Sequence, residues 1–326
     1  YRSMLAGKWH VGYHAGNGPR SHGFDEFQGS LIGTPGYYDV RESYHNEMPV
    51  KVEKYFTDHI TDHAVHFIEQ QKAPFFLYVA YNAPHYPLEA PANLVYKYRS
   101  RFPDDGLYAI YAAMVERMDT GIGKILNTLD SLDLTNNTLV VFASDNGPSA
   151  EPRTYGLPGA RISAGPLRDH KFSTHEGGIR VPFIARWPGK IPAGVVRNEP
   201  AIMMDLLPTF LDAAGIKPEK GQEIHGVSIL PLLQNKTFDT NRTLFWEDQY
   251  NLAVRKGNWK LVYRYYEDGP FLYDLSKDIG EKRDLSDQHP KLVTELLNAH
   301  EVWRNKHYPN PIHRQLQHSE FIFPSK

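Results

Sequence analysis

The chain of 326 residues is long enough for one large domain, or for a large domain with a small one attached. A formal net charge of −2 gives no indication of a nucleic-acid or anionic-membrane partner. Because the chain has no cysteine, disulfides, thiolate zinc sites and cysteine nucleophiles are excluded within it.

The first part of the chain alternates predicted strands and helices. Residues 1–50 are rich in Gly, Tyr and His and predict loops around a few short strands. Residues 53–71 predict a helix, because apolar side chains recur on one face. The run "APFFLYVAYNAPHYP" predicts a buried strand that enters a Pro-rich loop with His85, and residues 107–132 predict a long amphipathic helix. The apolar face of the first helix consists of Ile60, Ala64, Phe67 and Ile68.

The run "TLVVFASDNGPSAEP", from Thr138 to Pro152, predicts a second buried strand that stops at an acid, an amide and a glycine. Open α/β sheets bind their ligands just beyond the carboxyl ends of such strands. Asp145 and Asn146 therefore lie where a ligand would be held, and both offer oxygen to a cation. The alternative is an Asp-Asn-Gly turn that only ends the strand.

Further along, "GGIRVPFIARWPG" predicts a strand and "AIMMDLLPTFLDAAGI" a helix stopped by Gly215. This alternation predicts the α/β class, with a mostly parallel central sheet flanked by helices. After about residue 240, "NLAVRKGNWKLVYRYY" and "PFLYDL" predict an antiparallel sheet, followed by a helix near residues 289–306. We therefore expect an α/β domain over residues 1–240 and a small C-terminal subdomain over residues 241–326.

Four places combine reactive side chains with strand ends or loops. In "GKWHVG", Lys8 and His10 alternate with apolar residues, so on a strand both would point to one face. A loop histidine such as His85, or a loop lysine such as Lys171, is by itself more often only exposed. Taken together with Asp145 and Asn146, however, they describe a site for an oxyanion ester. The cation and the lysines would neutralise the anion, and the histidines would handle protons.

A competing cluster lies in "DHITDHAVHF", where His59, His63 and His66 recur at a spacing that can bind zinc from a helix. The apolar residues of the same helix lie on another face. We therefore favour a solvated face for the histidines.

The motifs "GKWHVG", "NAPHYP", "FASDNGPS" and "LRDHKFSTHEGGIRVP" occur in the order and character of the type I sulfatases, the arylsulfatase family of the alkaline phosphatase superfamily. The runs "SHGFDEFQGSLIGTPGYYD" and "LYDLSKDIGEKRDL" are similar to that family as well. The resemblance runs through nearly the whole chain. It implies an alkaline phosphatase-like fold and hydrolysis of sulfate monoesters at a calcium, sometimes magnesium, site.

The resemblance also implies a role for each motif residue. Asp145 and Asn146 would be metal ligands, and Lys8 and Lys171 would grip the sulfate oxygens. His85, with Lys171, would assist the leaving alcohol. The hydrated aldehyde of a formylglycine would attack sulfur, and His10 would contact this nucleophile and help to deprotonate the diol.

The formylglycine motif of the family, Cys-x-Pro-Ser-Arg, and its early pair of metal-binding Asp residues do not occur in these 326 residues. We therefore expect the chain to be the greater part of a sulfatase, cut at its amino end, with the nucleophile upstream. Loss of a central strand and its helix would leave apolar surface uncovered. We expect the chain alone to be inactive, and ester hydrolysis by the isolated chain would refute this.

Two other functions compete with a sulfatase. Phosphodiesterases and phosphatases of the same superfamily carry Asp-His after this strand, because imidazole suits a zinc pair. Asn146 is a hard oxygen ligand that suits calcium better. A non-catalytic binding protein that keeps the pocket without the nucleophile is the second alternative.

The substrate and the location are less well marked. Loops rich in Tyr, His and Arg favour a sulfated carbohydrate, such as a glycosaminoglycan, as the partner. These loop residues are Tyr37, Tyr38, Arg153, Tyr155, Arg161 and, as a substrate contact, His175. Three glycosylation-type triplets begin at Asn136, Asn235 and Asn241 and suit a glycoprotein. No apolar stretch is long enough to span a bilayer. We expect a secreted, periplasmic or lysosomal protein, with the missing amino-terminal segment as a further partner.

Overall fold

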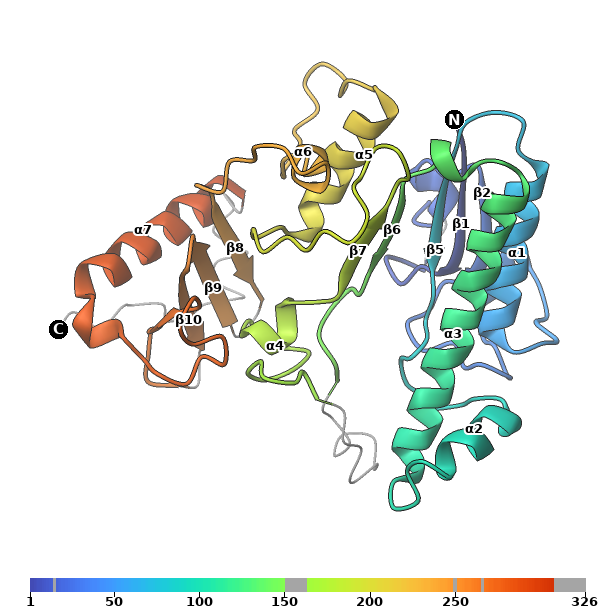
Figure 1. Ribbon diagram of the computed structural model, residues 1–326, viewed down its shortest axis with the longest axis horizontal. Helices are drawn as coiled ribbons and strands as arrows, with labels where there is room; N and C mark the ends of the chain where they lie inside the picture. The colour runs from blue at the N-terminus through green and yellow to red at the C-terminus, as the bar shows by residue number, and fades with distance from the viewer. Residues whose placement is uncertain (14–15, 150–162, 249–250, 265–266, 308–326) are drawn as a thin grey trace. The chain divides into compact units, whose positions relative to one another are not determined.

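The computed structural model describes residues 1–13, 16–149, 163–248, 251–264 and 267–307 (Figure 1). Within these ranges the chain packs as two compact units. The first contains residues 1–138, and the second contains residues 139–149 and 163–307. The predicted boundary at residue 240 falls inside the second unit. None of the described helices is both long and apolar enough to cross a bilayer.

The first unit is built on a five-stranded sheet with the order β4-β3-β2-β1-β5. Strand β1 pairs in parallel with both β2 and β5, and β3 and β4 extend the sheet in antiparallel fashion. The strands are β1 (Arg2–Lys8), β2 (Glu26–Ser30), β3 (Ser43–His45), β4 (Met48–Pro49) and β5 (Phe75–Ala80). The α/β class with a mostly parallel sheet is therefore confirmed.

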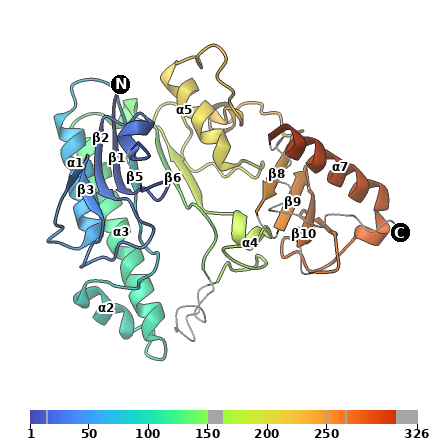
Figure 2. The ribbon, with the colours of Figure 1, turned by 180° about the vertical axis from the view of Figure 1, so that it is seen from behind.

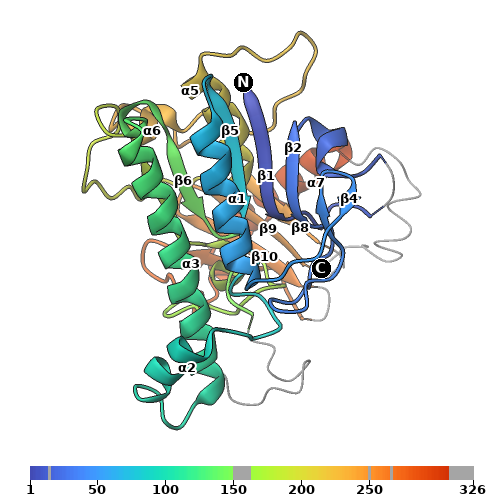
Figure 3. The ribbon, with the colours of Figure 1, turned by 90° about the vertical axis from the view of Figure 1, so that its right-hand side faces the viewer.

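Three helices accompany this sheet: α1 (Phe56–Gln70), α2 (Ala92–Arg99) and α3 (Gly106–Ser131). In Figure 3, α1 lies in front of β1 and β5, and α3 lies beside α1. The predicted apolar face of α1 is buried and packs with Met4 and Ala6 of β1. Asp105 caps the amino end of α3, and its side chain accepts a hydrogen bond from the Tyr108 backbone N–H. Both long helices agree with the prediction.

Strand β5 is partly buried on one face and exposed on the other, which differs from the predicted buried strand. Leu77 and Val79 pack against the core under α1, but Phe76 and Tyr78 are 39% and 53% exposed. The reason is the two-residue period of a strand, because α1 and α3 cover a single face of the sheet. An apolar run does not by itself distinguish one covered face from two.

The second unit begins with an antiparallel pair, β6 (Val140–Ala143) and β7 (Phe183–Arg186). The predicted buried strand at residues 138–143 is only half-buried, and Ile184 on β7 is 63% exposed. All four residues of β6 are partly buried without alternation, and among the described residues β6 and β7 pair only with each other, so no further strand shields their outer edges. Helix α4 (Glu176–Ile179) lies between these two strands in the sequence, and α5 (Leu206–Ala214) and α6 (Leu230–Leu233) come after β7. Helix α5 ends at Gly215 in the left-handed region, as predicted.

The C-terminal part of this unit is a four-stranded antiparallel sheet with the order β11-β10-β9-β8, of which Figures 1 and 2 label β8, β9 and β10. Its strands are β8 (Thr243–Glu247), β9 (Asn251–Lys256), β10 (Trp259–Arg264) and β11 (Phe271–Asp274). Helix α7 (Pro290–His307) packs on it through Leu296, which meets Leu252 and Leu261 in a buried cluster. The predicted antiparallel sheet and terminal helix are confirmed.

Helix α1 carries a pH-dependent part of the stability of the first unit. Gln28 Nε2 donates to His59 Nε2 across 2.8 Å, so the ring accepts here and is neutral. Burial, with smaller repulsion from His63 and Lys54, lowers the pKa of His59 from 6.5 to about 4. Between these pH values the folded state thus binds fewer protons than the unfolded state. The stability that the neutral His59 ring contributes is fully present above pH 6.5 and is lost as the pH falls towards 4.

We therefore expect His59→Gln to reduce the loss of stability on acidification. The difference in unfolding free energy between pH 7 and pH 4.5 should shrink by about 1–2 kcal/mol, after allowance for solvent screening. Urea unfolding at the two pH values measures it. His66→Gln, at an exposed position of the same helix, is the control. Equal pH dependence in His59→Gln and the parent protein would contradict the expectation.

Candidate active site

The predicted residues of the first unit follow the carboxyl ends of two neighbouring strands. Strands β1 and β5 are parallel, and Gly7 pairs with Ala80. Lys8 and His10 come at the end of β1, and His85 follows β5 after four residues of loop. A Cβ atom on Gly7 would lie 2.1 Å from the Ala80 carbonyl oxygen, so only glycine permits this approach. The sheet thus brings these three residues to one edge.

His10 does not continue the alternation of β1. The strand ends at Lys8, and His10 has a φ of 58°, in the left-handed region. Its backbone N–H donates to the Leu31 carbonyl across 3.0 Å. The ring occupies the space beside Gly33, where a Cβ atom would lie 2.2 Å from His10 Cε1. The prediction that Lys8 and His10 share a strand face is therefore wrong, because a backbone turn sets the direction of His10.

His85 is half-buried in the loop after β5. Its Nδ1–H donates to the Tyr86 carbonyl across 2.8 Å, which makes Nε2 the nitrogen that can exchange a proton. The Tyr37 hydroxyl donates to the His85 carbonyl across 3.0 Å, and this places the Tyr37 ring in the core. Tyr37 is thus buried and does not have the surface position expected of a saccharide contact, whereas Tyr38 is exposed. The predicted contacts Arg153, Tyr155 and Arg161 lie outside the described residues.

In the second unit, Asp145 and Asn146 form the turn directly after β6. The Asp145 Oδ1 atom accepts from the Asn146 backbone N–H at 3.0 Å, and Asn146 Nδ2 donates to the Gly147 carbonyl at 2.9 Å. These bonds leave Asp145 Oδ2 and Asn146 Oδ1 as the remaining oxygen donors of the turn. Asp145 is exposed and Asn146 is half-buried. A carboxylate and an amide oxygen are a donor set that fits a hard cation such as Ca²⁺.

Backbone contacts join this turn to the segment with Lys171. Gly147 N–H donates to the Gly178 carbonyl and Lys171 N–H to the Pro148 carbonyl, both across 2.9 Å. A Cβ atom on Gly147 would lie 1.8 Å from the Gly177 carbonyl oxygen. The structure therefore brings the metal-ligand candidates and Lys171 together. The glycine after Asp145 and Asn146 is needed for this packing.

Lys171 is half-buried, and its Nζ lies 5.4 Å from the ring centroid of the exposed Phe172. Its loop also contains a buried histidine. The His175 Nδ1–H donates to Asp169 Oδ2 across 2.9 Å, and the ring is fully buried. This placement does not favour the expected substrate contact for His175. The bond from His175, with smaller help from Ser173 and Arg264, outweighs burial and holds the pKa of Asp169 well below its usual value.

Sequence reasoning missed a buried ionic cluster in the second unit. Lys260, Glu176 and Glu281 are almost completely inaccessible to solvent, and Lys260 pairs with both carboxylates. Lys260 occurs in the strand run "WKLVYR", where the signal was a lysine between apolar residues. Glu176 belongs to the recognised "STHEGG" motif, but its partners are far away in the sequence.

The histidines proposed as an alternative metal site are not a solvated row. His59 and His63 are partly buried, and His59 pairs with Gln28, while His66 is exposed. Within the described ranges no group of three or more His, Asp or Glu side chains is arranged to hold a metal ion. The solvated-face prediction is thus wrong for two of the three histidines, because the helix packs closely against β2.

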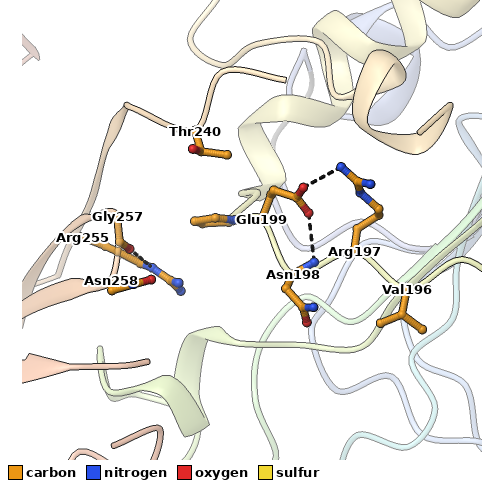
Figure 4. Close-up of a pocket in the computed structure, with 9 residues that line it drawn as sticks. Val196, Arg197, Asn198, Glu199, Thr240, Arg255, Gly257 and Asn258 are labelled. Atoms are coloured by element: carbon orange, nitrogen blue, oxygen red, sulfur yellow. Dashed lines mark hydrogen bonds and ion pairs between the residues drawn. The ribbon is translucent and has the colours of Figure 1, made fainter. Parts of the chain in front are cut away.

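A polar pocket of about 430 Å³ also lies in the second unit (Figure 4). Glu199 accepts hydrogen bonds there from Arg197 Nη2 and from the Asn198 backbone N–H. Arg255 lines the pocket as well, and its Nη1 lies 3.7 Å from Glu176 Oε2. The remaining lining residues are Val196, Pro200, Thr240, Gly257 and Asn258. None of the motif residues of the candidate site lines this pocket.

Comparison with protein families matches the Sulfatase model over residues 1–216 and the model "N-sulphoglucosamine sulphohydrolase, C-terminal" over residues 167–306. The chain is 34% identical over 281 residues to the N-acetylgalactosamine-6-sulfatase of Canis lupus familiaris, a match that covers 80% of this chain and 51% of that protein. It is 30% identical to the uncharacterized sulfatase YdeN of Escherichia coli strain K12, covering 85% and 55%. The chain thus spans about half the length of the curated relatives it matches.

Among solved structures, Ps i-CgsB in complex with k-i-k-neocarrahexaose matches with a TM-score of 0.82 and 31% identity, covering 93% of this chain and 71% of that one. The structure of BT4656 in complex with its substrate D-Glucosamine-2-N, 6-O-disulfate matches with a TM-score of 0.71. At 21% identity, with 95% and 80% coverage, this second likeness shows the fold alone.

Proposed function

This chain belongs to the sulfatase family, and we propose that the protein hydrolyses sulfate monoesters of a carbohydrate. The observation that carries the proposal is the turn at Asp145 and Asn146, which is joined to the Lys171 segment by backbone contacts of the next residues, Gly147 and Pro148. Two relatives support the substrate class by their names, one an N-acetylgalactosamine-6-sulfatase and the other crystallised with a neocarrahexaose. We further propose a secreted, periplasmic or lysosomal location.

Asp145 and Asn146 are the proposed ligands of a hard cation, Ca²⁺ or Mg²⁺. Asn146 favours calcium over zinc, because a hard divalent cation prefers carboxylate and amide oxygen to imidazole. When bound, the cation supplies positive charge that offsets the charge on the sulfate oxygens. The formylglycine implied by the family resemblance would supply the nucleophile, and no residue of this chain is given that role.

The proposed tasks of the other residues follow from their chemistry. The ammonium groups of Lys8 and Lys171 bind the sulfate oxygens and neutralise the negative charge that these oxygens carry. His85 has its Nδ1–H fixed by the Tyr86 carbonyl, so its Nε2 gives a proton to the leaving alcohol. His10 takes a proton from the hydroxyl of the nucleophile.

The test is an assay of the intact protein on matched esters. Sulfate release is measured from 6-sulfated N-acetylgalactosamine, a sulfated carrageenan oligosaccharide and 4-nitrophenyl sulfate, and phosphate release is measured from 4-nitrophenyl phosphate. We expect the highest kcat/KM on a sulfated saccharide. Hydrolysis of the phosphate ester alone would favour a phosphatase, and comparable turnover of the aryl sulfate with none on the saccharides would refute the carbohydrate assignment. Binding of saccharide without any turnover would favour a non-catalytic protein.

Replacement of Asp145 by alanine should weaken calcium binding at least tenfold, because the site loses its charged ligand. Isothermal titration with Ca²⁺ measures the affinity, and metal analysis of the purified protein identifies the resident ion. Asp287→Ala, at an exposed position of the same unit, is the matched control. Unchanged calcium affinity in Asp145→Ala, or zinc bound in stoichiometric amount, would contradict the assignment.

A further inference from the structure

The C-terminal sheet contributes a buried lysine to the surroundings of the candidate site. The side chain of Lys260 on β10 is 0% exposed, and its Nζ lies 2.8 Å from Glu176 Oε1 and 2.9 Å from Glu281 Oε1. The two carboxylates are themselves buried. Arg255 and Arg180 approach Glu176 Oε2 at 3.7 and 3.6 Å. Burial opposes ionisation of Glu176, but Lys260 and these arginines outweigh it and hold its pKa below the usual value.

Such a cluster is a poor source of general stability. Removing charges from water costs most of what their attraction returns, and apolar residues of similar volume often stabilise a core equally well. A buried ionic cluster does, however, fix geometry, because each charge must keep its partner. The role of these charges therefore depends on which segment they hold in place.

Glu281 holds both ends of the segment that contains Lys171. At one end, the backbone N–H of Glu176 donates to Glu281 Oε2 across 2.7 Å. At the other end, Arg168 Nη1 donates to the Glu281 carbonyl oxygen across 2.9 Å, and also to the Tyr273 hydroxyl. Glu281 itself has a φ of 49°, a backbone conformation that needs support from its surroundings.

We propose that Lys260 and Glu281 are positioning residues for Lys171. Together with Arg168 and Glu176 they form a clamp that holds residues 168–176 against the C-terminal sheet. The clamp fixes the backbone from which Lys171 extends and which contacts the Pro148 carbonyl. The catalytic part of the inference rests on the proposed function, since it assigns sulfate binding to Lys171. The structural part, that the clamp orders this segment, does not.

The test uses Glu281→Gln, which keeps the size and the oxygen acceptor of the side chain but removes its charge. A second variant, Lys260→Met with Glu176→Gln and Glu281→Gln, replaces the cluster by neutral groups and keeps the fold accessible if a single change fails. The control is Lys256→Met on neighbouring β9, which breaks an exposed ion pair with Glu295 at 2.7 Å.

The first readout is hydrogen exchange of the intact protein. We expect amides of residues 168–176 to exchange at least tenfold faster in Glu281→Gln and in the triple variant, with α7 unchanged and no effect in Lys256→Met. Unchanged exchange of this segment in both clamp variants would overturn the proposal, whether or not the protein is a sulfatase.

The second readout is kcat/KM on a sulfated saccharide. We expect Glu281→Gln to lower kcat/KM at least tenfold, and to change it less than twofold when Lys171 is already alanine, because the clamp then has no ammonium to position. An equal loss in both backgrounds would show that Glu281 acts through another group and would overturn the assignment to Lys171. A parent protein without activity would refute the proposed function, and the exchange result would still decide on the clamp.

Discussion

Replacement of Lys171 by alanine is expected to lower kcat/KM for sulfate-ester hydrolysis by about 10²–10³-fold. The ammonium group is proposed to contact the sulfate oxygens and to assist the leaving alcohol, on whose oxygen negative charge develops as the ester bond breaks. In a site from which water is excluded, such a charge stabilises the transition state far more than it would in water. The loss should therefore appear in kcat as well as in KM, since the contact strengthens during the reaction.

Two further variants make the Lys171 experiment specific. Lys171→Arg keeps the positive charge but replaces a compact ammonium by a planar guanidinium, so we expect partial activity between that of the parent and that of the alanine variant. Lys190→Ala removes an exposed lysine that follows β7 and should leave activity unchanged. Activity of Lys171→Ala within twofold of the parent would remove Lys171 from the site. Thermal unfolding of all three variants separates loss of chemistry from loss of fold.

Local patterns predicted the elements whose form depends on their own residues. The 3.6-residue apolar period of α1 reappears as the buried face with Ile60 and Ala64, and Gly215 ends α5 with a left-handed backbone. The run that predicted the antiparallel sheet forms β9 and β10, which turn at Gly257 with a φ of 57° that glycine permits. In each case the deciding interaction lies within a few residues of the signal.

Properties that depend on distant partners were not predictable in the same way. The apolar runs of β5 and β6 predicted buried strands, but burial depends on what covers each face. One face of β5 is exposed, and all four residues of β6 are only partly buried. The antiparallel pairing of β6 with β7 likewise has no local signal. His175 was expected to contact substrate, yet its ring is buried beside Asp169.

The motif residues of the candidate site were found, but not what fixes them. Lys260 and Glu281 lie more than 80 residues from the segment that they hold, as the separations of 84 and 105 residues in their bonds to Glu176 show. A lysine in a strand is on average a solvated charge. Only the fold reveals that this one is buried between two carboxylates.

The glycine that follows the metal-ligand candidates provides the second large expected effect. Replacement of Gly147 by alanine should destabilise the protein by about 1–3 kcal/mol and lower kcat/KM by about 10²-fold. The added methyl group would lie 1.8 Å from the Gly177 carbonyl oxygen and 3.0 Å from Gly178 Cα, so backbone must move. The nearest atoms belong to the backbone and not to a flexible side chain, so the clash can be relieved only by moving the two loops apart.

That movement would separate the two parts of the site at once. Gly147 and Pro148 are adjacent, and their backbone groups bond Gly178 and Lys171 in the other loop. A shift at Gly147 should therefore disturb both Asp145 with Asn146 and the backbone of Lys171. Gly147→Ala should therefore weaken both calcium binding and catalysis. Lys171→Ala should lower catalysis but leave calcium binding unchanged. Calcium titration, thermal unfolding and kcat/KM measure the three effects. Gly123→Ala, in helix α3 with nothing within 4 Å of the added atom, is the control and should be neutral or slightly stabilising. If Gly147→Ala keeps its calcium affinity while its activity falls, the two loops are not coupled through this contact, and the joint positioning of cation and lysine is refuted.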